Sequence, residues 1–192
     1  EAARAAIATP QLEDAITLAD AYAIQAESLR RRYGRGERRV GIKMGFTSRA
    51  KMVQMGVDEM IWGRLTDAMC IEDGGTISHA RFVHPRVEPE IAYLLKADLP
   101  EVTAPLAALA AVAGVAPALE IIDSRYRNFK FSLTDVVADN SSSSAFVIGP
   151  WNDPGQDLSN RGMVLEIDGR LRQVGSSAAI LGNPLRSLVA AA

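Results

Sequence analysis

Apolar positions along the chain predict more strands than helices. Short apolar runs rich in β-branched and aromatic residues cover 40–46, 88–95, 115–122 and 145–149, and runs of this length and composition favour strands. Segments 163–167 and 171–174 flank Asp168-Gly169, a dipeptide typical of hairpin turns. We therefore expect an α+β fold with a mixed, largely antiparallel β-sheet.

Helices are expected at the periphery of this sheet. Thr17 is a suitable N-cap for a helix over 18–32 that gathers arginines at its C-terminal end. Further helices are predicted over 48–55 and 105–112, and Asn183-Pro184 is expected to open a last one. The pattern predicts one catalytic domain over 1–192, with an N-terminal helical segment (1–39) and a β-rich metal-binding core (40–192).

Three glutamates interrupt the apolar runs. Glu88 and Glu90 lie two residues apart, so in a strand they project from the same face, and Glu120 lies inside the next strand. Buried carboxylates require a partner, and grouped carboxylates either take up a proton or bind a hard cation such as magnesium, manganese or calcium. The alternative is that Glu88 and Glu90 lie on a solvated sheet edge beside Arg86.

Composition narrows the possible chemistry. The 192 residues are 48% hydrophobic, with a formal charge of -2, which argues against nucleic-acid binding. The only cysteine, Cys70, excludes internal disulfides and multi-thiolate metal sites, and His79 and His84 are too few for a histidine-rich centre. No signal peptide or long apolar segment occurs, so we expect a cytoplasmic protein.

Other polar residues interrupt apolar segments near these glutamates. The complete set is Lys43, Asp67, Glu88, Glu90, Glu120, Asp123, Arg125 and Asn140. Three carboxylates can fix a divalent ion and leave coordination sites open for a ligand with adjacent carboxylate and keto oxygens. A lysine near such a centre can supply a proton or a fixed positive charge.

Several longer motifs resemble one family. Residues 41–48 (GIKMGFTS), 50–57 (AKMVQMGV), 84–90 (HPRVEPE) and 121–131 (IIDSRYRNFKF) are similar to the hydratase/decarboxylase family. This family comprises 2-hydroxypenta-2,4-dienoate hydratases and 4-oxalocrotonate decarboxylases, within the fumarylacetoacetate hydrolase superfamily. The match runs from about residue 19 to 188.

The resemblance implies a fold and a set of residue roles. It implies a β-sheet roll like the fumarylacetoacetate hydrolase C-terminal domain, with Mg²⁺ or Mn²⁺ held by Glu88, Glu90 and Glu120. Lys43 would transfer a proton or stabilise charge, Asp67 would orient Lys43 or a water, and Arg125 or Arg127 would contact a substrate carboxylate. The alternatives are that Lys43 only pairs with a sheet carboxylate, that Asp67 caps a turn and that Arg125 braces Asp123.

The resemblance also implies an activity. The motifs around Lys43 and Asp123 favour the decarboxylases, which convert 2-oxohex-3-enedioate (4-oxalocrotonate) to 2-hydroxypenta-2,4-dienoate in the meta-cleavage degradation of aromatic compounds. One alternative is the hydratase, which adds water to that dienoate to give 4-hydroxy-2-oxopentanoate. Others are a non-catalytic partner subunit and an acylpyruvate hydrolase or isomerase of the wider superfamily.

Assembly and the chain end give two further expectations. The family implies a homo-oligomer, and the decarboxylases are thought to associate with the hydratase of the pathway. Family members continue with further strands beyond the helix at Pro184, so the roll is expected to be incomplete at its C-terminal end. Asn183 stands where a histidine is often expected in the family.

Overall fold

The computed structural model describes residues 2–12, 16–49, 52–53, 59–99, 101 and 104–192. Its helices are α1 (Ala2–Ala5), α2 (Leu18–Tyr33), α4 (Pro105–Ala110), α5 (Leu133–Ala138) and α6 (Leu185–Ala190). Its strands are β1 (Arg39–Gly45), β2 (Ile61–Thr66), β3 (Cys70–Ile71), β4 (Pro85–Leu95), β5 (Val112–Asp123), β6 (Ser143–Ile148), β7 (Gly162–Ile167) and β8 (Arg170–Ser176). Among these residues no helix combines the length and apolar character needed to cross a membrane.

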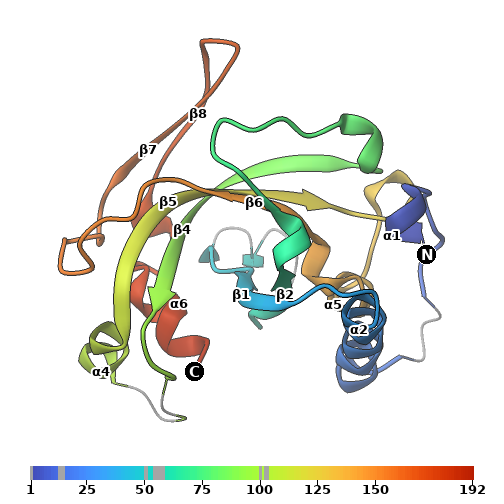
Figure 1. Cartoon of the computed structure of the whole chain (residues 1–192), viewed down its shortest axis with the longest axis horizontal. Coiled ribbons are helices and arrows are strands. Elements are labelled where there is room, and N and C mark those ends of the chain that lie inside the picture. The colour runs from blue at the N-terminus through green and yellow to red at the C-terminus, as the bar shows by residue number, and fades with distance from the viewer. Residues whose placement is uncertain (1, 13–15, 50–51, 54–58, 100, 102–103) are drawn as a thin grey trace. The chain divides into compact units, whose positions relative to one another are not determined.

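The strands form three sheets. Strands β1 and β2 pair antiparallel, β7 and β8 pair antiparallel, and a four-stranded sheet has the order β3-β6-β5-β4. Figure 1 shows β4 and β5 as long neighbouring strands. Strand β3 pairs parallel to β6, so the fold is mixed, and the predicted α+β class with a largely antiparallel roll is confirmed.

The chain divides into two compact units. The first comprises Glu1–Gly45, Ile61–Glu88 and Leu119–Val147, and the second comprises Phe46–Met60, Pro89–Ala118 and Ile148–Ala192. The prediction of one domain over 1–192 is not tested by this division and stays a prediction.

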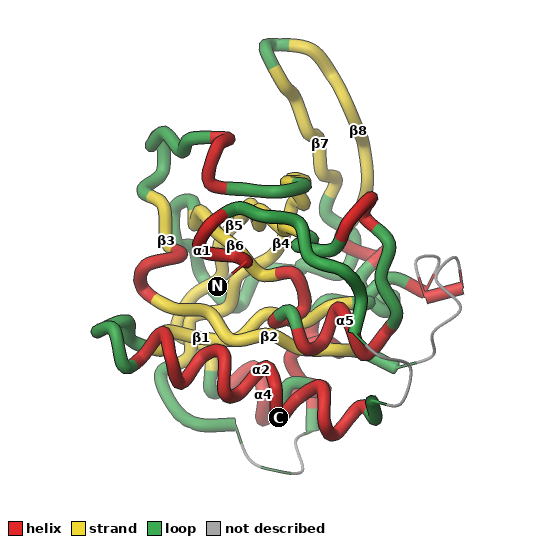
Figure 2. Tube along the Cα trace, turned by 90° about the vertical axis from the view of Figure 1, so that its right-hand side faces the viewer, coloured by secondary structure: helices red, strands yellow, loops and turns green. Residues whose placement is uncertain are grey.

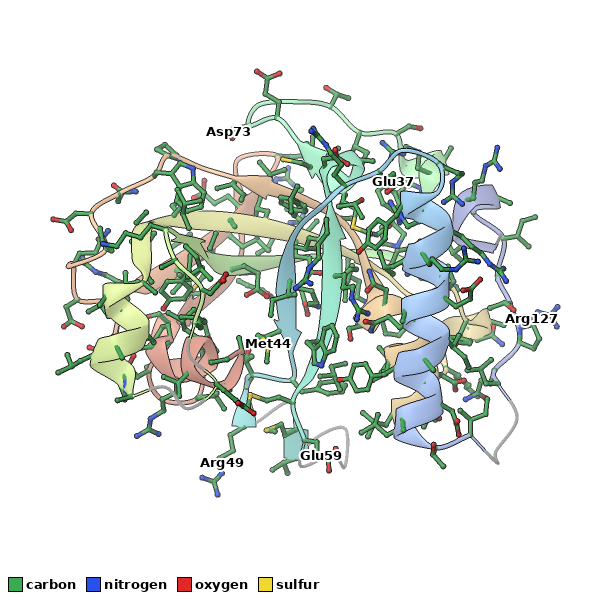
Figure 3. All side chains as sticks on the ribbon, turned by 60° about the horizontal axis from the view of Figure 1, so that its bottom comes forward. Glu37, Met44, Arg49, Glu59, Asp73 and Arg127 are labelled. Atoms are coloured by element: carbon green, nitrogen blue, oxygen red, sulfur yellow. The ribbon has the colours of Figure 1, made fainter. Side chains whose placement is uncertain are left out.

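Helix α2 runs beside the β1–β2 pair in the first unit, as Figure 3 shows. The predicted N-cap is confirmed, because the Thr17 hydroxyl accepts the Asp20 main-chain N–H at 3.2 Å while Asp20 accepts the Thr17 N–H at 3.1 Å. The fully buried Gln25 amide donates to the carbonyls of Trp62 and Val137, both at 3.0 Å. Gln25 thereby ties α2 to β2 and α5.

Helix α5 is not among the predicted helices, although its start has the spacing of a capping box. The Ser132 hydroxyl accepts the Asp135 N–H at 3.1 Å, and Asp135 accepts the Ser132 N–H at 2.8 Å. Asp135 also accepts the Leu12 N–H at 2.8 Å. The helix has only six residues, too few for helical periodicity to be recognised in the sequence.

The second unit has its own apolar core. Ala108 of α4, Val112 and Val115 of β5 and Leu188 of α6 are buried together. The predicted helix over 105–112 ends at Ala110 because β5 begins at Val112. The predicted last helix is found as α6, where the Asn183 side chain accepts the Leu185 N–H at 2.9 Å.

The predicted hairpin is present as β7 and β8. Asp168 and Gly169 both have positive φ (55° and 67°), the turn conformation for which this dipeptide is suited. Figure 2 shows the hairpin as a long two-stranded ribbon. Strand β1 confirms the strand predicted over 40–46, and β4, β5 and β6 confirm the other three. Half of the helix predicted over 48–55 lies outside the described residues, which include 48, 49, 52 and 53.

Candidate metal centre

Three glutamates from two neighbouring strands come together in the four-stranded sheet. Glu88 and Glu90 of β4 and Glu120 of β5 each offer a carboxylate oxygen, and these oxygens lie within 4.8 Å of one another. Glu120 is 5% exposed, whereas Glu88 and Glu90 are half-buried. The two-residue spacing places Glu88 and Glu90 on one face of β4, and the pairing of β4 with β5 brings Glu120 beside them.

This donor set fits a hard divalent cation. Carboxylate oxygens are the ligands that magnesium, manganese and calcium prefer. Three such groups so close together repel one another when ionised, and a cation relieves that repulsion. Two further residues supply charge and hydrogen bonds to the same cluster.

Lys43 provides the positive charge. Its ammonium Nζ lies 2.9 Å from a Glu120 carboxylate oxygen, and both side chains are largely buried. Nζ also donates to the Ser141 carbonyl oxygen at 3.3 Å. Strand β1 thus places the lysine of the Gly-Ile-Lys motif against the cluster, an arrangement in which a buried cation and a buried anion neutralise each other.

Residues 140–142 form a strained segment directly before β6. Asn140, Ser141 and Ser142 have consecutive positive φ values of 57°, 52° and 59°, a conformation that is unfavourable for residues other than glycine. Ser143, which follows directly, donates its hydroxyl to Glu120 at 3.3 Å. The strained segment therefore sets the hydrogen bonds made to both Lys43 and Glu120.

Neighbouring contacts hold this segment in place. The Asn140 side chain accepts the Arg64 main-chain N–H at 2.8 Å and donates to the Arg64 carbonyl at 2.9 Å. A Cβ on Gly63 would lie 2.4 Å from the Asn140 carbonyl oxygen, so only glycine permits this approach. Asn140 was among the predicted residues, whereas Gly63 was not. A glycine inside a strand is the sequence feature that could have indicated this close approach.

Arg125, predicted to contact a substrate carboxylate, is buried and bound to protein groups. Its Nε lies 2.8 Å from the Asp139 carboxylate, and one terminal nitrogen donates to the Asp139 carbonyl at 2.8 Å. Burial raises the pKa of Asp139, whereas the adjacent guanidinium acts in the opposite direction. Arg125 thus pairs with Asp139 and not with Asp123, which accepts the Val83 and His84 N–H groups. A contact between Arg125 and substrate stays a prediction.

Asp67 lies apart from the residues around Lys43. Its carboxylate accepts the Arg38 N–H at 2.9 Å and pairs with the Arg38 guanidinium at 3.0 Å, and these contacts hold the pKa of Asp67 below its usual range. Lys43 pairs with Gly63 in the β1–β2 register, and Asp67 is four residues beyond Gly63, roughly 13 Å along an extended chain. Its predicted role in orienting Lys43 or a water stays a prediction.

Asp67→Asn tests that role. The amide keeps the size of the side chain and loses only an exposed ion pair, which contributes little to stability. We expect turnover close to that of the unchanged protein, because the lost ion pair with Arg38 is exposed and lies apart from Lys43. Steady-state kinetics check this, and a loss of 100-fold or more in kcat with an unchanged melting temperature would instead place Asp67 in the reaction.

The chain is similar in sequence to decarboxylases and hydratases of 2-oxo acids. No family model matches the chain. A 4-oxalocrotonate decarboxylase from Pseudomonas sp is 61% identical over 194 residues, covering 100% of this chain and 76% of that protein. A 2-hydroxypent-2,4-dienoate hydratase from Pseudomonas putida is 42% identical over 175 residues, covering 88% of this chain and 78% of that protein.

Solved structures agree in fold. The 4-oxalocrotonate decarboxylase from Pseudomonas putida G7, complexed with magnesium and adipate, superposes with a TM-score of 0.94 at 40% identity, covering 99% of this chain and 75% of that one. The fumarylpyruvate hydrolase from Pseudomonas aeruginosa, in complex with Mn²⁺ and pyruvate, shares the fold at a TM-score of 0.58 and 16% identity, over 80% and 70% of the two chains. The chain therefore belongs to the family of 4-oxalocrotonate decarboxylases and 2-hydroxypentadienoate hydratases.

Proposed function

We propose that the protein is a divalent-metal-dependent lyase that decarboxylates 4-oxalocrotonate to 2-hydroxypenta-2,4-dienoate. The observation that carries this proposal is the cluster of Glu88, Glu90 and Glu120 with Lys43 paired to Glu120, in a chain of this family. The decarboxylase is preferred to the hydratase because the relative of that name has the higher identity, 61% against 42%.

The glutamates are the proposed metal ligands. Glu88, Glu90 and Glu120 would hold Mg²⁺ or Mn²⁺, for which three carboxylates are a suitable donor set. When bound, such a cation supplies a Lewis acid for a 2-oxo acid. The Ser143 hydroxyl orients Glu120 through its 3.3 Å hydrogen bond, so the carboxylate is fixed from one side by serine and from the other by lysine.

The reaction makes a specific demand on Lys43. In 4-oxalocrotonate the bond between C5 and C6 breaks, and its electron pair moves through the alkene to the 2-keto oxygen, which leaves carbon dioxide and a dienolate. We propose that Lys43 acts on the negative charge that develops on the 2-keto oxygen. Its Nζ holds a proton beside Glu120 and either stabilises this oxyanion or donates the proton to it. Hydrogen bonding of Nζ to the strained Ser141 carbonyl positions that proton.

Hydration is the second candidate, favoured by the 42% identical hydratase. It begins from the same dienol, which takes up a proton at its far end before water adds to the resulting enone. Lys43 and the glutamates would serve both reactions. The two activities differ in what the protein offers to the distal end of the substrate, a group for a second carboxylate or a positioned water and acid.

One experiment separates the candidates. The protein is given 4-oxalocrotonate and 2-hydroxypenta-2,4-dienoate separately, with magnesium or with chelator, while carbon dioxide release and dienol absorbance are followed. We expect magnesium-dependent carbon dioxide release from the diacid. Dienol loss without carbon dioxide release would establish the hydratase instead, and absence of both reactions would favour the non-catalytic partner subunit.

Assembly and location complete the proposal. We place the protein in the meta-cleavage degradation of aromatic compounds, as a cytoplasmic homo-oligomer that associates with the pathway hydratase. The support is the family membership and the single cysteine, Cys70, which is free and exposed. Light scattering of the protein alone and mixed with a family hydratase tests the assembly.

A further inference from the structure

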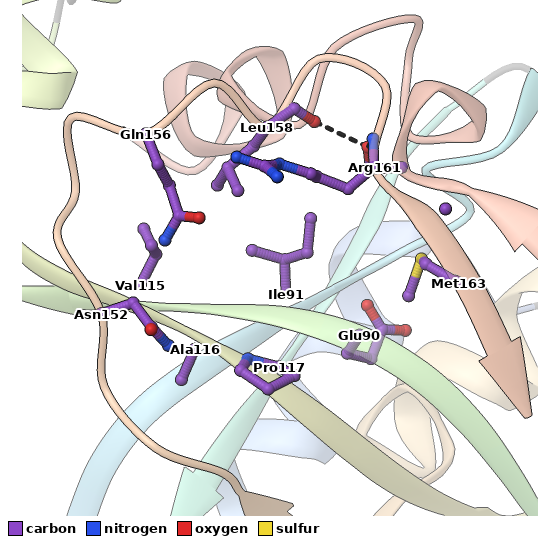
Figure 4. Close-up of a pocket in the computed structure, with 12 residues that line it drawn as sticks. Glu90, Ile91, Val115, Ala116, Pro117, Asn152, Gln156, Leu158, Arg161 and Met163 are labelled. Atoms are coloured by element: carbon purple, nitrogen blue, oxygen red, sulfur yellow. Dashed lines mark hydrogen bonds between the residues drawn. The ribbon is translucent and has the colours of Figure 1, made fainter.

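A cavity of about 220 Å³ lies within the second unit, and Glu90 forms part of its wall. The cavity is smaller than the pockets of roughly 300–1,000 Å³ that bind drug-sized ligands, so it suits a small organic acid. Strands β4 and β5, the loop before β7 and the start of β7 contribute the lining. Figure 4 shows the Glu90 carboxylate at one side of this space and the Arg161 guanidinium extending over Ile91.

The cavity combines apolar walls with two charges. Ile91, Val115, Ala116 and Leu158 give apolar surface, and of the residues that line the cavity only Glu90 and Arg161 carry a charge. A carbon chain suits such walls, and a carboxylate suits an arginine, whose planar fork binds two oxygens at once. The lining therefore matches a short acid with a negatively charged end.

Arg161 is held firmly at its main chain. Its N–H donates to the Ser177 hydroxyl at 2.7 Å, and the Ser177 N–H donates to the Arg161 carbonyl at 2.9 Å. The same Ser177 hydroxyl donates to the Leu158 carbonyl at 2.6 Å, and Ser177 is fully buried. A completely buried serine thus fixes the position from which the arginine side chain extends.

The guanidinium is oriented by a main-chain carbonyl, and the nearby Asp157 carboxylate interacts with it electrostatically without forming an ion pair. Its Nε donates to the main-chain carbonyl of Asp157 at 2.7 Å, whereas the Asp157 carboxylate accepts the Ser159 N–H at 2.8 Å. In the described part of the chain no carboxylate lies within 4.0 Å of the Arg161 nitrogens. The terminal nitrogens therefore remain able to bind an external carboxylate.

We propose that Arg161 is a specificity-determining residue that binds the distal carboxylate of a six-carbon diacid whose 2-oxo end is directed to Glu90. This inference rests on the proposed function and names the group that distinguishes a diacid from a monoacid at the same site. Arg125 and Arg127, the arginines expected from the resemblance, are less suitable, because Arg125 is bound to Asp139 and neither is among the residues that line the cavity.

The reaction itself predicts how this contact acts. The distal carboxylate leaves as neutral carbon dioxide, so its attraction to Arg161 weakens as the bond breaks. A contact that is stronger in the bound substrate than in the transition state tightens binding without accelerating the chemical step. Arg161→Gln is therefore expected to raise KM for 4-oxalocrotonate by about 10- to 100-fold, the loss typical of a charge-assisted hydrogen bond, and to leave kcat equal or higher.

A binding measurement tests the proposal independently of turnover. Calorimetry in the presence of magnesium compares 2-oxohexanedioate with 2-oxohexanoate, which differ only in the terminal carboxylate. The unchanged protein is expected to bind the diacid more tightly, and Arg161→Gln to lose about 10- to 100-fold for the diacid and less than twofold for the monoacid. Arg161→Lys should recover part of the preference, and Arg172→Gln, at an exposed arginine of β8, should retain all of it.

Several results would overturn the inference. Arg161→Gln that keeps the full diacid preference, or that loses both acids equally while its melting temperature is unchanged, removes Arg161 from this role. If Arg161→Gln unfolds, Arg161→Lys decides, since a folded Lys variant that keeps the full diacid preference or weakens both acids equally also contradicts the proposal. Failure of the unchanged protein to release carbon dioxide would contradict the proposed function but not the role of Arg161. The ratio of the affinities for 2-oxohexanedioate and 2-oxohexanoate does not depend on turnover.

Discussion

Glu120→Gln is expected to lower kcat/KM for decarboxylation by about a thousandfold or more, because it removes the negative charge of a proposed metal ligand from a buried centre. It also replaces the carboxylate that pairs with Lys43 at 2.9 Å and accepts the Ser143 hydroxyl at 3.3 Å. Magnesium affinity is expected to fall by at least about 100-fold. Steady-state kinetics over a magnesium titration and calorimetry of the ion check both effects.

A matched variant separates this effect from a general change of charge. Glu166 is an exposed glutamate of β7, and Glu166→Gln should keep the activity and magnesium affinity of the unchanged protein. Breaking the buried pair also costs stability, on the order of 3 kcal/mol, so the melting temperature is recorded for each variant. A folded Glu120→Gln protein with undiminished magnesium affinity is incompatible with the proposed ligand set.

Lys43→Met is expected to have the second largest effect, a loss of about 100- to 10,000-fold in kcat, with magnesium affinity that is equal or higher. The ammonium pairs with Glu120, which is also a proposed metal ligand, so removing the ammonium would leave more negative charge for the ion. A residue that only supported the fold would lower both quantities together. Kinetics at saturating magnesium and calorimetry of the ion distinguish these outcomes.

The variant Lys43→Arg distinguishes the two proposed roles of the lysine, charge stabilisation and proton transfer. Arg keeps the positive charge but does not release its proton in proteins, so Lys43→Arg should regain activity if charge stabilisation suffices and should stay inactive if proton transfer is required. Lys96→Met, at an exposed lysine beyond β4, serves as the control and should behave as the unchanged protein. A Lys43→Met protein with full turnover would remove Lys43 from the mechanism.

The strong local patterns in the sequence were sufficient for much of the fold. The Thr17 cap, the Asp168-Gly169 turn and the apolar runs of β4, β5 and β6 each act through a few neighbouring residues, and all were found as predicted. Helix α5 was missed because its six residues are stabilised by the distant Leu12 and Gln11, which bond to Asp135. Such tertiary support leaves little trace in a local pattern.

In the candidate site, too, residues placed by a local sequence pattern were predicted, whereas residues placed by contacts distant in sequence were not. The period of a strand explains why Glu88 and Glu90 share a face, and the burial of Glu120 required a partner that proved to be Lys43. Arg161 was not predicted, because its position depends on Ser177, which lies sixteen residues away, directly after the β7–β8 hairpin. Asp67 was selected as a polar residue near apolar segments, its role was taken from the resemblance, and nothing in its local sequence specified its pairing with Arg38.

Crystals soaked in Mn²⁺ and measured at the manganese absorption edge test the central claim most directly. If Glu88, Glu90 and Glu120 hold one divalent ion, an anomalous peak will lie within about 2.6 Å of an oxygen from each of the three carboxylates. A map without a peak at this position, from crystals in which the ion is present at millimolar concentration, would contradict it.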